Sequence, residues 1–217
     1  MVTALLAALF VLVTLRPGSA TASSRMVRRL VTAWIAQNLV LVFSAALRTW
    51  DYVEAYSLTV LRLSALLWMA LVAAGLALVW WRMLAGKSAS WLINANLASA
   101  GLLLTGVCFV DLAAVSATWN VRHAKEIDGD GAGLDLCYLD ALRGSAVPAL
   151  IELDQRHLPG QLGADAGSLR NIAQERARLW RDRGGWNLLL DRRLAQASAA
   201  PASTDAHHLP DRCDERD

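Results

Sequence analysis

Charged side chains are scarce in this chain, and their scarcity is the first indication of its class. Only 18% of the 217 residues are charged, whereas 55% are hydrophobic. The mean hydropathy is +0.35. A soluble domain of this size needs a more polar surface. The composition therefore predicts a membrane protein, with the lipid bilayer as its main partner.

Other scarcities exclude further classes. Three cysteines are too few for a small disulfide-rich scaffold. His207, His208 and Cys213 lack a second ligand pair, so no metal site is predicted. The net charge is only +2, and basic residues lie in short loops or are matched by acids, which argues against nucleic acid. No nucleophile–base order, phosphate-binding loop or carboxylate pair stands out. The sequence thus predicts no enzyme, no catalytic residues and no cofactor.

Four apolar runs without proline occupy residues 2–15, 30–47, 58–81 and 91–117. They predict an all-α fold: a polytopic transmembrane helix bundle of about four spans in residues 1–118. The first run would be only about 21 Å long against a hydrocarbon core of about 30 Å. It could instead be a signal peptide, because the small residues Ala20, Thr21 and Ala22 follow it. Against this, no basic residue precedes it. A third alternative is that Met1 begins inside what was once a longer membrane domain.

Basic residues predict the orientation, since Lys and Arg beside helix ends stay in the cytoplasm. The first connection holds Arg16, Arg25, Arg28 and Arg29, the third holds Arg82 and Lys87, and the second holds Arg48 with Asp51 and Glu54. Connections one and three are therefore expected in the cytoplasm. With four spans, both termini and everything after residue 118 would lie outside.

Past Trp119 the chain becomes charged and amphipathic. Residues 119–196 are predicted to form an extramembrane helical segment, because apolar residues recur at helical spacing in 136–153 and 168–181. The glycine-rich stretch 128–133 lacks calcium-ligand spacing and is expected to be a flexible linker. Residues 197–217 read as a disordered tail. A disulfide between Cys137 and Cys213 is permitted if both face an oxidising compartment.

Six polar side chains interrupt the predicted spans: Gln37, Asn38, Arg62, Asn94, Asn96 and Asp111. If the third and fourth runs form antiparallel helices joined near Gly86, two residues that are equally far from this turn in sequence lie at the same depth in the membrane. Arg62 lies 24 residues before Gly86 and Asp111 lies 25 after it. The matched depth and opposite charge suggest an ion pair between them. Alternatively, Arg62 extends to the outer surface while Asp111 finds other partners.

The same arithmetic pairs Ala73 with Ser99 and Ala77 with Ala95, small residues that allow two helices to approach closely. Two amides near the start of the fourth run, Asn94 and Asn96, are expected to cap that helix or to bind Gln37 and Asn38. A role in lining a polar pathway is the alternative.

Several motifs together resemble a known family. They are Tyr52-Val-Glu-Ala-Tyr56-Ser-Leu-Thr59, Leu61-Arg62-Leu63, Ala65-Leu-Leu-Trp68-Met69, Trp91-Leu-Ile-Asn94-Ala-Asn96, Phe109-Val-Asp111 and Asn120-Val-Arg122-His123. The stretch from about residue 16 to 153 resembles the C-terminal portion of the bacterial integral-membrane family described as domain of unknown function 4173, and its relative 4153. The resemblance implies the bacterial inner membrane and, in family members, further membrane helices upstream. It supplies no catalytic residues.

The functional expectation is a structural or accessory inner-membrane protein, whose spans anchor a periplasmic helical segment and contact a membrane-protein partner. A component of a transporter or of an ion or proton pathway, using Asp111 and Arg62, is the main alternative. A membrane-tethered enzyme would require clustered titratable groups, and the second half offers only dispersed ones.

Overall fold

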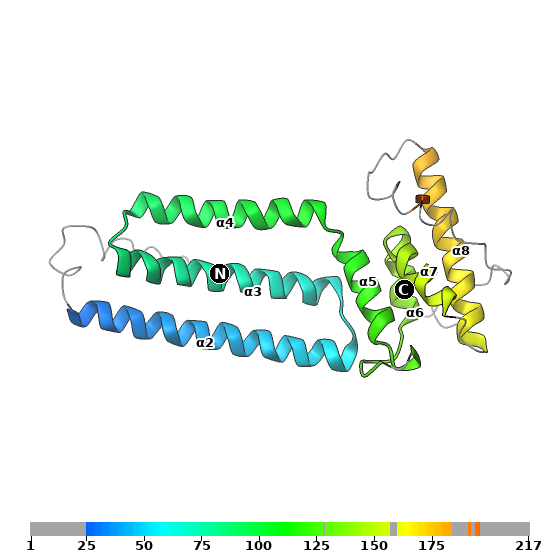
Figure 1. Cartoon of the computed structure of the whole chain (residues 1–217), viewed down its shortest axis with the longest axis horizontal. Helices are drawn as coiled ribbons and strands as arrows, with labels where there is room; N and C mark the ends of the chain where they lie inside the picture. The colour runs from blue at the N-terminus through cyan, green and yellow to red at the C-terminus, as the bar shows by residue number, and fades with distance from the viewer. Residues whose placement is uncertain (1–24, 128, 157–159, 184–190, 192–193, 196–217) are drawn as a thin grey trace. The chain divides into compact units, whose positions relative to one another are not determined.

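Every regular element in the part of the chain that the structure describes is a helix, as the sequence predicts (Figure 1). The computed structural model describes residues 25–127, 129–156, 160–183, 191 and 194–195. These residues form two compact units. Unit 1 contains residues up to Thr49 and Ala65–Gly106, and unit 2 contains Trp50–Ser64 and the residues from Val107 onward.

Three helices are long and apolar enough to cross a membrane: α2 (Arg25–Tyr56), α3 (Val60–Ala85) and α4 (Ala89–Phe109). The predicted runs 30–47 and 58–81 correspond to α2 and α3. The run 2–15, which would have made a fourth span, lies outside the described residues. Three candidate spans are thus established among the residues described.

The predicted fourth span, 91–117, is divided between two helices. α4 ends at Phe109, and α5 (Leu112–His123) begins after Asp111. Asp111 has extended backbone angles, and its side chain accepts from the amides of Ala113 and Ala114. A carboxylate in this position is a strong helix N-cap, so a new helix starts where the apolar run continues. The single span expected here was wrong in its C-terminal part.

The turn between α3 and α4 follows standard capping chemistry. Gly86 has φ +62°, and the Lys87 amide donates to the Arg82 carbonyl at 3.2 Å. This is the Schellman arrangement, in which glycine adopts the left-handed conformation at low cost. Ser88 then caps α4 by accepting from the Trp91 amide at 3.1 Å. The hairpin therefore turns at Gly86, as predicted.

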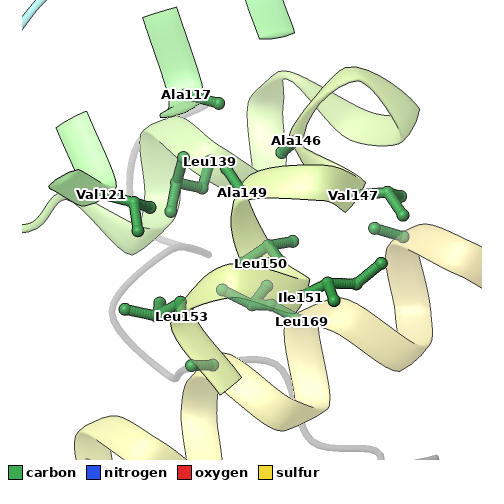
Figure 2. Close-up of a cluster of buried hydrophobic side chains, with 12 residues drawn as sticks. Ala117, Val121, Leu139, Ala146, Val147, Ala149, Leu150, Ile151, Leu153 and Leu169 are labelled. Carbon is green, nitrogen blue, oxygen red and sulfur yellow. The ribbon is translucent and has the colours of Figure 1, made fainter. Parts of the chain in front are cut away.

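Unit 2 has its own hydrophobic core, centred on α7 (Val147–Gln155) (Figure 2). α7 packs against α5, the short 3₁₀ helix η2 (Arg143–Ala146) and α8 (Gln161–Asp182). The core residues include Ala117, Val121, Leu139, Val147, Leu150, Leu153 and Leu169. The amphipathic pattern of 136–153 and 168–181 thus predicts the buried faces of α6 (Leu136–Ala141), α7 and α8.

The glycine-rich stretch after α5 is packed onto the helix end instead of being a loose linker. The Gly131 amide donates to the His123 carbonyl at 2.9 Å, and the Gly129 amide donates to the Ala124 carbonyl at 3.0 Å. A Cβ at Gly129 or Gly131 would lie 2.5 Å or 2.4 Å from the His123 carbonyl oxygen. Glycine is needed because the loop backbone covers the last carbonyls of α5 at contact distance.

Candidate functional site

A polar network in the described part of unit 2 surrounds the turn between α2 and α3. Its acceptors and donors are the backbone of Leu58 and Val60 and the side chains of Ser116, Asn120 and Tyr138, which we call the turn clasp. Leu58, Ser116 and Asn120 are all buried. The network joins residues about 60 to 80 positions apart in sequence, from α5 and α6 to the turn.

Asn120 makes two hydrogen bonds to the same backbone residue. Its Oδ1 accepts from the Leu58 amide at 2.7 Å, and its Nδ2 donates to the Leu58 carbonyl at 2.9 Å. A carboxamide can do this because it carries an acceptor and a donor side by side. Without Asn120 the buried Leu58 amide would be unpaired, at considerable free-energy cost. The Asn120 side chain thus pairs with the backbone amide and carbonyl of Leu58 in the way that a neighbouring β-strand would.

Two hydroxyl groups complete the turn clasp. Ser116 Oγ donates to the Leu58 carbonyl at 2.7 Å and lies 2.9 Å from the Tyr138 hydroxyl. Because the single Ser116 hydroxyl hydrogen is used on Leu58, the Tyr138 hydroxyl donates to Ser116 Oγ. The Tyr138 oxygen in turn accepts from the Val60 amide at 2.9 Å. This satisfies one of the unpaired amides in the first turn of α3.

Arg62 caps the end of α2. Its Nη1 donates to the Tyr56 carbonyl at 2.8 Å and to the Ser57 carbonyl, and its guanidinium lies 6.0 Å from the Tyr56 ring centre. Ser57 has φ +69°, so α2 ends in the left-handed conformation without a glycine. A cation at a helix C-terminus is stabilised by the helix dipole and the free carbonyls.

The Asp111 carboxylate accepts hydrogen bonds from α5 and η2. Oδ1 accepts from the amides of Ala113 and Ala114 at 2.9 and 3.2 Å, and Oδ2 accepts from Ser145 Oγ at 2.9 Å. Among the described residues, Arg62 and Asp111 do not form the expected ion pair. Each charge instead satisfies backbone groups at a helix end, which is the physical reason that the depth argument failed.

Aromatic rings link the C-terminal part of α2 to α5 within unit 2. Trp50 and Trp119 meet edge to face, with ring centres 5.6 Å apart. Trp119 stacks on His123 at 3.9 Å, and Trp50 Nε1 donates to Glu54 at 2.8 Å. Such contacts add to the polar bonds of the turn clasp.

The four predicted amides of the membrane helices behave in two ways. Asn38 donates to the Trp34 carbonyl at 2.8 Å, and Asn96 donates to the Leu92 carbonyl at 2.9 Å, so both bond to their own helix. Gln37 and Asn94 are exposed, and neither side chain is hydrogen-bonded to a described residue. The expected pairing between the amides of α2 and α4 is therefore absent from the described residues.

One contact between α3 and α4 is consistent with the predicted register. A Cβ added at Gly75 would lie 3.1 Å from Asn96 Oδ1. The depth arithmetic, which pairs Ala73 with Ser99 and Ala77 with Ala95, places Gly75 beside residue 97. Glycine at this point lets the Asn96 side chain approach α3 closely.

Several ion pairs join charged side chains of unit 2. Glu152 binds Arg122 at 3.0 Å and Arg156 at 3.1 Å. Partial burial opposes the charged form of Glu152, but the hydrogen bonds and charges of the two arginines prevail and lower its pKa. The hydrogen bond and charge of Glu152 raise the pKa of Arg122. Arg170, which is 1% exposed, pairs with Asp154 and joins α8 to α7.

These groups hold backbone segments and helices together. No cluster of three or more His, Cys, Asp or Glu side chains suited to a metal ion occurs among the residues that the structure describes.

Sequence reasoning missed Ser116, Asn120 and Tyr138 as site residues. Ser116 and Asn120 stand one helical turn apart on α5, a polar pair at the end of an apolar run, and that spacing was the available signal.

No curated protein and no solved structure matches the chain. The resemblance to domain of unknown function 4173 is not shown by the comparison. The model of its relative matches the sequence over residues 1–153, which includes all three candidate spans and the turn clasp. The chain therefore belongs to the family described as Domain of unknown function (DUF4153).

Proposed function

We propose that this chain is an accessory protein of the bacterial inner membrane, without catalytic activity of its own. In this proposal α2, α3 and α4 anchor a helical domain, α5–α8, on the periplasmic side, where it contacts a partner protein. The observation that carries the proposal is the turn clasp. A buried network that fixes the α2–α3 turn to α5 and α6 suits a protein whose task is to hold a domain at a membrane surface.

The basic residues support this orientation. Arg25, Arg28 and Arg29 stand at the start of α2, and Arg82 and Lys87 stand at the α3–α4 turn. Arg28 donates to the Met83 carbonyl at 2.9 Å, so these two ends of unit 1 lie at the same level. Five positive charges at one level favour the cytoplasmic side.

Cys137 supports the opposite location for unit 2. Cys137 is disulfide-bonded, whereas Cys213, its suggested partner, lies outside the described residues. Disulfides persist in oxidising compartments such as the periplasm. The position of Cys137 at the start of α6 therefore favours a periplasmic domain.

Asp111 and Arg62 favour the accessory role over transport. A proton or ion route needs an ionisable group that faces a water-filled path. The Asp111 carboxylate instead caps α5 and accepts from Ser145, and Arg62 caps α2. Both charges are thereby accounted for by backbone and side-chain bonds within unit 2.

Cysteine labelling tests the topology. In a chain whose three native cysteines are replaced by alanine, Glu175→Cys at an exposed position of α8 and Ser90→Cys at an exposed position near the start of α4 are compared. A membrane-impermeant maleimide added to spheroplasts is expected to label Glu175→Cys at once and Ser90→Cys only after lysis. Ser90 is chosen over Lys87 because it leaves the orienting charges intact. Labelling of Ser90→Cys before lysis, or protection of Glu175→Cys, would contradict the orientation.

A flux measurement tests the absence of transport by the Asp111 route. Purified protein in liposomes that contain a pH-sensitive dye is expected to leak protons no faster than empty liposomes. A leak that the wild type shows and Asp111→Asn lacks would overturn the accessory role.

A further inference from the structure

One face of α2 carries a continuous seam of exposed side chains at heptad spacing. Its members are Met26, Leu30, Ala33, Gln37, Val40, Ser44 and Leu47, separated alternately by four and three residues. All seven are exposed in this chain. A strict alternation of this kind is the pattern by which two helices pack in a left-handed coiled coil. The described part of the chain supplies no partner helix for the seam.

The seam faces away from the residues that α2 contacts in the described part of the chain. Ile35 is 1% exposed and is the one buried residue in the described N-terminal half of α2. At about 100° per residue it lies some 200° around the helix from Gln37. The buried side and the seam are therefore opposite faces of the same helix.

Gln37 occupies the middle of the seam and of the apolar run. It lies seven residues after Leu30 and ten before Leu47, about 10 Å from the nearer end. Its carboxamide is exposed and makes no hydrogen bond to a described residue. An amide left unpaired in hydrocarbon is costly, so a partner at this depth is required if α2 spans the membrane.

We propose that the partner is α2 of a second copy of this chain, with the two Gln37 side chains hydrogen-bonded to each other across the seam. A carboxamide is self-complementary, since its donor and acceptor pair with the acceptor and donor of an identical group. Two copies inserted in one orientation place α2 parallel to α2, so Gln37 meets Gln37 at the same depth. A two-fold axis then satisfies both amides at once. The inference assumes the membrane embedding proposed above.

Disulfide cross-linking in native membranes tests the seam. In the cysteine-free chain, Ala33→Cys and Val40→Cys flank Gln37 on the seam, and Leu39→Cys lies on the opposite face. Oxidation is expected to give a dimer-sized band from the two seam variants and at least tenfold less from Leu39→Cys. Equal cross-linking on both faces, no dimer from any variant, or a band that contains a different protein would overturn the proposal.

A substitution tests Gln37 itself, with a matched control at the next residue. Asn38 is also an amide, but it donates to its own helix through Trp34. Gln37→Leu is expected to weaken dimerisation about three- to thirty-fold, the range measured for interhelical hydrogen bonds, while Asn38→Leu leaves it within about twofold. Dimerisation is followed by energy transfer between labelled copies in liposomes diluted with lipid. Membrane insertion, checked by carbonate extraction, separates a failure of embedding from a failure of pairing. An unchanged dimer in Gln37→Leu would refute the role of the amide.

Discussion

Asn120 carries a donor and an acceptor on one amide, and both are used on the backbone of Leu58. That residue lies in the short turn between α2 and α3, where no helix hydrogen bond can satisfy it. Ser116 shares the Leu58 carbonyl, but no other described side chain reaches the Leu58 amide. The amide of Leu58 thus depends on Asn120 alone among the described side chains.

The first prediction follows from this dependence. Asn120→Ala leaves the buried Leu58 amide unsatisfied and is expected to cost about 2–3 kcal/mol in the free energy of unfolding. Thermal unfolding in detergent, followed by tryptophan fluorescence, measures the loss. Asn94→Ala is the control, because Asn94 is exposed and unbonded within the described chain. A Tm that falls equally in both variants would remove the special role of Asn120.

Glu152 gives a prediction about pH. Because its folded pKa is below the ordinary value of 4.5, its ion pairs stabilise the fold above that value, and the contribution is lost as the pH falls through the folded pKa. Glu152→Gln is therefore expected to lower Tm slightly at pH 7, where the ion pairs of this partly exposed group contribute about 1 kcal/mol or less, and the two Tm curves are expected to converge between about pH 5 and pH 3. Glu175→Gln, on the exposed surface of α8, is the control. Parallel Tm curves for wild type and Glu152→Gln would contradict the shift.

At the scale of elements, the glycine-rich loop after α5 explains how that helix ends. Its backbone amides reach the carbonyls of His123 and Ala124 because Gly129 and Gly131 bring no side chain between them. Glu126 supports the loop from the other side by accepting from the Leu134 amide at 3.0 Å. The loop is therefore a helix cap made of main chain.

Replacing one of these glycines tests that explanation. A Cβ at Gly131 would stand 2.4 Å from the His123 carbonyl oxygen, which cannot move without disturbing α5. Gly131→Ala is expected to destabilise unit 2 by about 2 kcal/mol or more. Gly133→Ala should cost far less, since its Cβ would meet only the end of the Glu126 side chain at 3.3 Å. The Tm values of the two variants in detergent are compared. Equal values would mean that the loop moves to accommodate the Gly131→Ala methyl group.

Helices α2, α3 and α4 could be predicted from the sequence, because long apolar runs are local patterns. The end of α4 at Phe109 was missed because Leu112, Ala113 and Ala114 continue the apolar run beyond Asp111. The signal was present, since an Asp before a helix-forming stretch is a typical N-cap. The turn clasp could not be foreseen in this way. It joins Leu58 to Asn120 and Val60 to Tyr138, and only the folded arrangement of unit 2 determines such distant pairs.

At the scale of the whole molecule, contacts divide the chain into two compact units, whereas composition divides it near residue 118. The sequence becomes charged past Trp119, but α5 begins earlier, at Leu112. Unit 2 also takes in Trp50–Ser64, the segment that connects α2 with α3. Arg62 and Asp111, which hydropathy assigns to membrane helices, therefore belong to unit 2. There each of them caps a different helix.

Because Arg62 and Asp111 cap different helices, their contributions to the free energy of unfolding are expected to be independent. Asp111→Ala removes an N-cap and the acceptor of Ser145, and is expected to cost about 1–2 kcal/mol. Asp111→Asn should cost much less, because asparagine caps helices about as well as aspartate. Were Asp111 the ionic partner of Arg62, the neutral asparagine would lose the pair and cost as much as alanine. Arg62→Gln, which loses its charged bonds to Tyr56 and Ser57, is expected to cost about 1 kcal/mol. Unfolding of the single and double variants in detergent should give additive losses within about 0.5 kcal/mol. A larger coupling energy would support the ion pair between Arg62 and Asp111 and would require a different arrangement of the two side chains in the membrane.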